Sequence, residues 1–138
     1  MEDRQLSGEF KWSMLGDLNL GREHLGAEMP VLVYRLFQYT MRAVLAREYG
    51  TEEMIRLFRK SGELAGEEFA ENILDLTLSR EAFFAELQEK LKELQIGILR
   101  FEEFDEENGH AVLTVGEDLD CSGLPVSGEC VCNYDEGF

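Results

Sequence analysis

The sequence has 138 residues, enough for one domain that buries about two-thirds of the surface of its unfolded chain. With 44% hydrophobic residues and 2 prolines, its composition is typical of a globular protein that needs neither a disulfide framework nor a metal to fold. The formal charge of −16 argues against a nucleic acid or an anionic membrane surface as a partner, because both would repel the chain.

The N-terminal segment MEDRQLSGEFKW has no basic stretch followed by an apolar one, so it does not resemble a signal peptide. Nowhere do eighteen apolar residues follow one another, so no membrane-spanning segment is predicted. We therefore expect a cytoplasmic protein, in which thiols stay reduced. A short strand over Phe10 to Leu15, followed by a glycine-containing loop, is the first predicted element.

A helix is predicted from Pro30 to Gly50. Its polar residues Arg35, Gln38 and Arg42 fall on one side, and nearly every other position is apolar. Because a helix that is apolar around most of its circumference is normally surrounded by other elements, we expect it to be the centre of the domain, with the polar stripe in water.

A second helix is predicted to follow Gly50, and its interior contains Gly62 and Gly66, one turn apart. Each glycine costs the helix about 1 kcal/mol relative to alanine, and close approach of another backbone is the simplest compensation. A third helix is predicted from Ser79 to about Leu94, with an apolar stripe along one side.

The period of the apolar pattern changes after Gln95. Two strand-like stretches within 96–117 flank Asn108-Gly109, a strong hairpin signal. A further short strand is predicted in GECVCNY, residues 128–134. The predicted fold is therefore a single α+β domain over 1–138: an N-terminal β element, then a three-helix cluster packed on a C-terminal antiparallel sheet.

After Arg100 the chain contains no lysine or arginine and eleven acids. We expect these acids to form a solvated end of the molecule, and the alternative is that some of them bind a cation. The histidines His24 and His110 are expected to be exposed. No phosphate-binding loop, nucleophilic serine motif or dinucleotide fingerprint is present, so an enzyme is the less favoured class and no nucleotide cofactor is expected.

The three cysteines, Cys121, Cys130 and Cys132, lie within twelve residues. On a strand, Cys130 and Cys132 would point to the same face, and Cys121 could fold back toward them across a loop. Zinc prefers such soft ligands in a tetrahedral set, but this spacing is not that of a standard zinc finger or ribbon. A zinc site and three reduced thiols both remain possible.

The helices and the N-terminal segment carry a surplus of aromatic and methionine residues. At helical spacing such residues form a core more often than a pocket, but beside helix glycines they can also line a small apolar cavity. The candidate ligand-binding residues are Trp12, Tyr34, Phe37, Met41, Met54, Phe58 and Phe69.

Four segments resemble the 4-vinyl reductase, or hydrocarbon-binding, domain family: GREHLGAEMPVLVYRLFQYTMRAVL, SGELAGEEFAE, LQIGILRFEEF and CVCNYDEGF. The sharpest of these is the last, from Cys132 to Phe138. The resemblance covers most of the chain in its order of elements, and it extends to the sensor domains of aromatic-responsive transcription activators.

The resemblance implies a homodimeric α+β domain that binds a small hydrophobic or aromatic molecule. It implies a sensory or carrier role that is non-catalytic by itself. In the aromatic sensors zinc is held by cysteines and an acid, so Cys132 or Cys130 would be the first ligand. The family pattern continues into a cysteine-rich element beyond Phe138, which this chain is expected to lack. The alternatives are an enzyme or accessory subunit in tetrapyrrole vinyl reduction, and a structural dimerisation module.

Overall fold

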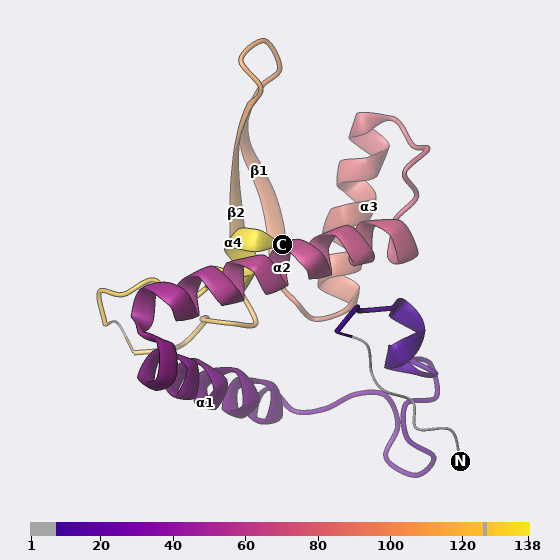
Figure 1. Ribbon diagram of the computed structural model, residues 1–138. Coiled ribbons are helices and arrows are strands. Elements are labelled where there is room, and N and C mark those ends of the chain that lie inside the picture. The colour runs from indigo at the N-terminus through magenta and orange to yellow at the C-terminus, as the bar shows by residue number, and fades with distance from the viewer. Residues whose placement is uncertain (1–7, 126) are drawn as a thin grey trace.

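The computed structural model describes residues 8–125 and 127–138; the first seven residues, on which the exclusion of a signal peptide partly rests, lie outside this part. The elements in chain order are the 3-10 helix η1 (Trp12–Leu15), α1 (Val31–Tyr49), α2 (Thr51–Ile73), α3 (Arg80–Glu93), β1 (Ile98–Asp105), β2 (His110–Gly116) and α4 (Asn133–Gly137) (Figure 1). Three long helices precede one antiparallel strand pair in these residues, so the α+β prediction is confirmed.

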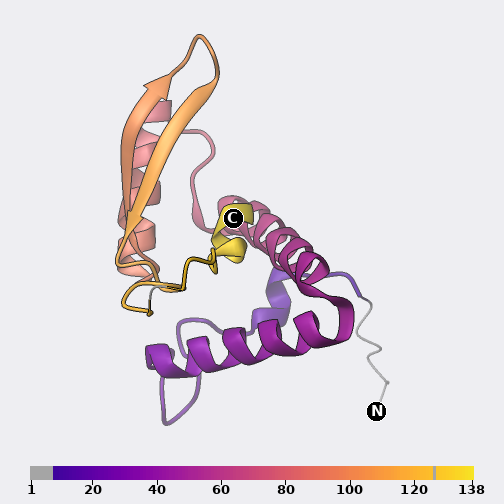
Figure 2. The same ribbon diagram turned by 90° about the vertical axis from the view of Figure 1, so that its left-hand side faces the viewer.

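Helix α3 and the hairpin form where the sequence predicts them. The Ser79 hydroxyl accepts a hydrogen bond from the backbone N–H of Ala82 (3.4 Å) and so caps α3. Strands β1 and β2 pair from Ile98 opposite Gly116 to Asp105 opposite His110, with one irregularity after Phe101. The hairpin projects from the rest of the molecule, and α3 lies along it (Figure 2).

A small apolar core lies where the end of α2 meets α3 and β1. It is built from Phe69, Leu74, Leu91 and Leu99. The expected packing of helices on the sheet therefore involves α3 and the C-terminal end of α2. Helix α1 instead packs on α2 and lies away from the hairpin (Figure 2).

The predicted orientation of α1 is wrong. Gln38 and Arg42, expected in water, are only 4% and 9% exposed, whereas Leu32 and Phe37 are 71% and 66% exposed. The two arginines turn inward because they find acceptors there: Arg35 donates to backbone carbonyls of the loop after β2, and Arg42 donates to the Asn133 side chain (3.0 Å). Gln38 is buried with them, but its amide has no hydrogen-bond partner among the described protein atoms. Within the described ranges, no helix has both the length and the apolar character needed to cross a bilayer.

Two predicted strands are also wrong. Residues Phe10 to Leu15 do not form the N-terminal β element; the chain instead turns into η1, where the N–H of Met14 donates to the carbonyl of Lys11 (2.9 Å). Residues 128–132 form a loop, and Asn133 and Tyr134 begin α4, whose first turn carries two acids, which a helix N-terminus favours. A strand needs a paired neighbour for its backbone groups. In these segments the carbonyls of Lys11 and Cys132 instead accept from the nearby N–H groups of Met14 and Glu136.

Candidate functional site

A hollow of about 540 Å³ opens between the N-terminal segment, α1, α2 and the C-terminal segment. Its walls are mostly aromatic and aliphatic. The lining residues are Phe10, Trp12, Leu15, Leu18, Tyr34, Ser61, Leu64, Ala65, Glu68, Phe69, Ile73, Leu94, Ile96, Leu119, Asp120, Tyr134, Asp135 and Phe138. Three of the predicted ligand-binding residues, Trp12, Tyr34 and Phe69, lie among them.

A second hollow of about 400 Å³ lies between α1 and α2. The predicted residues Phe37, Met41 and Phe58 line it, and it shares Tyr34 with the first hollow. Met54 lines neither of these two hollows; it is a buried core residue. The predicted set is therefore divided between two neighbouring hollows and the core.

Gln38 is an unusual wall residue of the second hollow. Its side chain is buried, yet neither its amide nitrogen nor its amide oxygen has a hydrogen-bond partner among the described protein atoms. A buried amide without partners costs free energy, so a group that fills this hollow and both donates and accepts would gain from it.

Glycines allow α4 to pack directly against α2, and α4 is the close backbone neighbour that Gly62 and Gly66 predict. A Cβ added at Gly62 would overlap the carbonyl oxygen of Tyr134, and one at Gly66 would overlap that of Phe138. In the opposite direction, a Cβ at Gly137 would overlap the carbonyl oxygen of Arg59 on α2. This contact fixes α4, and with it Asp135, at the polar end of the larger hollow.

The loop after β2 is folded around the side chain of Asp118. One of its oxygens, Oδ1, accepts from the N–H of Asp120 (2.8 Å), the N–H of Cys121 (3.0 Å) and the Cys121 thiol (3.3 Å). Helix α1 holds the loop from the other side, because Arg35 donates to the carbonyls of Leu119 (2.9 Å) and Ser122 (2.8 Å). These bonds turn the loop so that Asp120 points into the molecule.

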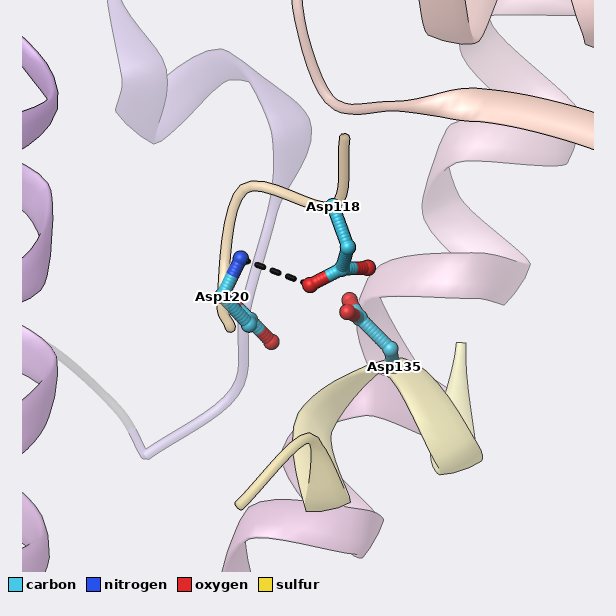
Figure 3. A group of neighbouring side chains, drawn as sticks. All are labelled: Asp118, Asp120 and Asp135. Carbon is cyan, nitrogen blue, oxygen red and sulfur yellow. Dashed lines mark hydrogen bonds between the residues drawn. The ribbon is translucent and has the colours of Figure 1, made fainter. Parts of the chain in front are cut away.

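Three carboxyl groups meet at the polar end of the larger hollow: Asp118 and Asp120 from the loop, and Asp135 from α4 (Figure 3). The Tyr34 hydroxyl donates to Oδ1 of Asp120 (2.7 Å). Burial and the two neighbouring carboxylates raise the pKa of Asp135 to about 9, so in the absence of a cation this group carries a proton at neutral pH. Burial and the bond to Asp120 also raise the pKa of Tyr34, which therefore remains a donor.

The acids after Arg100 are expected from the sequence to be solvated, and that prediction is wrong for Asp118 and Asp120, which are buried. The signal was weak: the pattern Asp118-x-Asp120 follows a predicted strand, and Asp135 lies in the segment that carries the family resemblance. Their meeting depends on α4 docking against α2, which no local pattern reveals. The histidines His24 and His110 are exposed, as predicted.

The cysteines are only partly brought together. The sulfurs of Cys130 and Cys132 lie 3.7 Å apart, and Cys130 lies 3.4 Å from a carboxylate oxygen of Glu136. Two thiolates on a tetrahedral zinc ion, each about 2.3 Å from it, are separated by about 3.8 Å, so this pair fits such an ion. Cys121 instead contacts Asp118. Among the described residues, the three thiols do not form a set of ligand atoms all within 4.8 Å of one another, so zinc stays a prediction.

Comparison with known proteins adds no assignment to this geometry. No protein-family model, no curated protein and no solved structure matches the chain. The resemblance to 4-vinyl reductase domains therefore stays a prediction that depends on the four segments quoted above.

Proposed function

We propose that this chain is a cytoplasmic binding domain for a small hydrophobic or aromatic molecule, with a sensory or carrier role and no catalysis of its own. The observation that carries this proposal is the hollow of about 540 Å³, whose walls are mainly apolar side chains. Ligand sites in proteins have volumes of about 300–1,000 Å³, with apolar walls and a few polar groups that fix orientation.

The chemistry of the walls favours an aromatic guest. Aromatic side chains approach the hollow from four parts of the chain: Trp12 from η1, Tyr34 from α1, Phe69 from α2, and Tyr134 from α4. Rings offer edge-to-face and offset-stacked contacts to another ring. The resemblance to hydrocarbon-binding domains supports the same class of ligand.

Trp12 supplies the assay, because it is the only tryptophan and it lines the hollow. The purified chain is titrated with benzene, naphthalene, phenol and indole derivatives and with medium-chain alcohols, and tryptophan emission and the unfolding temperature are followed. A ligand at a hundred times its Kd should stabilise the fold by about 2.7 kcal/mol.

The matched variants are Ala65→Leu, which fills the hollow from α2, and Ala85→Leu, which adds the same atoms at an exposed position on α3. We expect the first to abolish binding and the second to leave it unchanged. If no compound shifts the emission or the unfolding temperature of the wild-type chain, the proposal is wrong.

A second candidate function, homodimerisation, is favoured by the outward face of α1. Leu32, Leu36 and Phe37 are all at least 60% exposed, and a contiguous apolar face of this kind on a protein surface usually marks an interface. We propose that this face packs on the same face of a second copy, and the two functions are compatible.

Sedimentation velocity over a range of protein concentrations tests the dimer. Leu36→Glu should give a monomer because it places a charge in the centre of the apolar face, whereas Lys92→Glu on α3 adds an acid away from that face and should leave the dimer intact. A wild-type chain that stays monomeric at the highest attainable concentration would exclude the dimer.

A further inference from the structure

The acidic group at the end of the larger hollow brings three negative side chains into a small volume. One carboxylate oxygen from each of Asp118, Asp120 and Asp135 can be chosen so that all three lie within 4.8 Å of one another. Their side chains converge from two segments of the chain, the loop after β2 and α4 (Figure 3). Ionised carboxylates at such distances repel one another strongly when they are withdrawn from water.

No cationic side chain compensates this charge in the part of the chain that the structure describes. None of its ion pairs includes Asp118, Asp120 or Asp135. The Arg35 guanidinium hydrogen-bonds to this loop, but it donates to backbone carbonyls and not to the three carboxyl groups.

An independent observation is the state of Asp120. The residue is only 1% exposed. Its Oδ1 accepts from the Tyr34 hydroxyl, whereas its Oδ2 is buried with no hydrogen-bond partner among the described protein atoms. Oδ2 of Asp135 is likewise buried and unpartnered. An ionised carboxylate can only accept, so these two oxygens call for a proton or a cation.

We propose that Asp118, Asp120 and Asp135 bind one hard divalent cation of the Mg²⁺, Mn²⁺ or Ca²⁺ class. The ligand set consists only of carboxylate oxygens, which such ions prefer, while zinc and copper favour sulfur and imidazole. The ion supplies the positive charge that the neighbouring side chains lack, and it satisfies the buried oxygens of Asp120 and Asp135.

The location gives the ion a relation to the proposed ligand site. Asp120 and Asp135 also line the larger hollow, so the cation lies at its polar end, beside the aromatic walls. The cation site does not depend on the proposed ligand-binding function, and it is tested without any organic ligand.

The full chain, stripped with EDTA and dialysed, is titrated with MgCl₂, MnCl₂ and CaCl₂ by calorimetry, and Mn²⁺ binding is followed independently by electron paramagnetic resonance. We expect one ion per chain. The three salts compared at equal concentration identify the preferred ion: Ca²⁺ accepts more protein oxygens, whereas Mg²⁺ keeps more of its water.

Two variants each remove one carboxylate with little change of shape: Asp120→Asn and Asp135→Asn. Each should weaken binding at least tenfold. Glu107→Gln, at the exposed hairpin turn, removes the same charge elsewhere and should leave the affinity unchanged. Circular dichroism in EDTA establishes that each protein is folded.

If none of the three ions binds to the folded wild-type chain, the proposal is wrong, and a proton is then what reduces the negative charge of the three carboxyl groups. Equal affinity in wild type and in both asparagine variants would also overturn it, because the ion would then bind elsewhere among the many surface acids.

Discussion

The contact between α2 and α4 and the intrinsic helix propensity have opposite expected effects on the stability of Gly62→Ala. In an exposed helix interior, glycine to alanine stabilises by about 1 kcal/mol. For Gly62→Ala we expect destabilisation. The new methyl group would overlap the carbonyl oxygen of Tyr134, with the carbonyl carbon of Tyr134 at 2.9 Å and the amide nitrogen of Phe138 at 3.0 Å. All three atoms belong to the backbone, so no side-chain rotation can relieve the clash.

The magnitude follows from these opposing terms. Overpacking a tight contact costs about 1–3 kcal/mol, and we expect the upper end because α4 must move as a unit. Subtracting the propensity gain leaves a net loss of about 2 kcal/mol, which for a domain of this size lowers the unfolding temperature by about 6–10 °C.

Urea denaturation and calorimetry measure the change in the free energy of unfolding. Glu67→Ala, at an exposed position of the same helix, is the control and should change it by less than about 0.5 kcal/mol. If Gly62→Ala were as stable as the wild type, or more stable, the docking of α4 against this part of α2 would be refuted.

The remaining predictions concern the loop and α4. Burial and the bond to Asp118 raise the pKa of Cys121 to about 12. Its rate of alkylation by iodoacetamide, measured by mass spectrometry, should therefore be lower than that of exposed Cys130 and should increase about tenfold per pH unit from pH 7 to 9. Equal rates for the two cysteines would contradict the burial of Cys121. Arg42→Ala should lower the free energy of unfolding by about 1–3 kcal/mol, because it leaves the buried Asn133 oxygen without its donor; a neutral result would disprove this. If zinc binds the cysteine pair, elemental analysis should find it in the wild type and not after Cys130→Ser with Cys132→Ser; unchanged zinc would place the metal elsewhere.

Local patterns were sufficient for the elements whose stability is local. The Ser79 cap defines the start of α3, and Asn108-Gly109 defines the hairpin, where Gly109 adopts a positive φ of 61°. Gly62 and Gly66 likewise indicated a close backbone neighbour, because glycine inside a helix is costly without one. In each of these cases a few adjacent residues carry the information.

The rest depends on contacts between distant segments. On sequence alone Gln38 and Arg42 belong in water, yet both are buried. The acceptor that Arg42 finds, the side chain of Asn133 at the start of α4, is 91 positions away in the sequence. Asp120 is predicted from the sequence to be a solvated acid, but in the fold one of its oxygens accepts a hydrogen bond from Tyr34, which is far from it in the sequence. Amphipathic patterns report which face of a helix differs from the other, but they do not report which partner each face meets.

The acidic group also ties together the two ends of one stretch of chain. Asp120 and Asp135 are fifteen positions apart in the sequence, and all three cysteines lie between them. An ion bound to both Asp120 and Asp135 would close this segment into a ring, as a covalent crosslink does. In the chain-entropy model of crosslinks, closing a ring of about fifteen residues stabilises the fold by about 3 kcal/mol, because it lowers the conformational entropy of the unfolded state. Amide hydrogens between positions 121 and 134 should then exchange more slowly when Mn²⁺ or Ca²⁺ is added, even though none of them touches the metal.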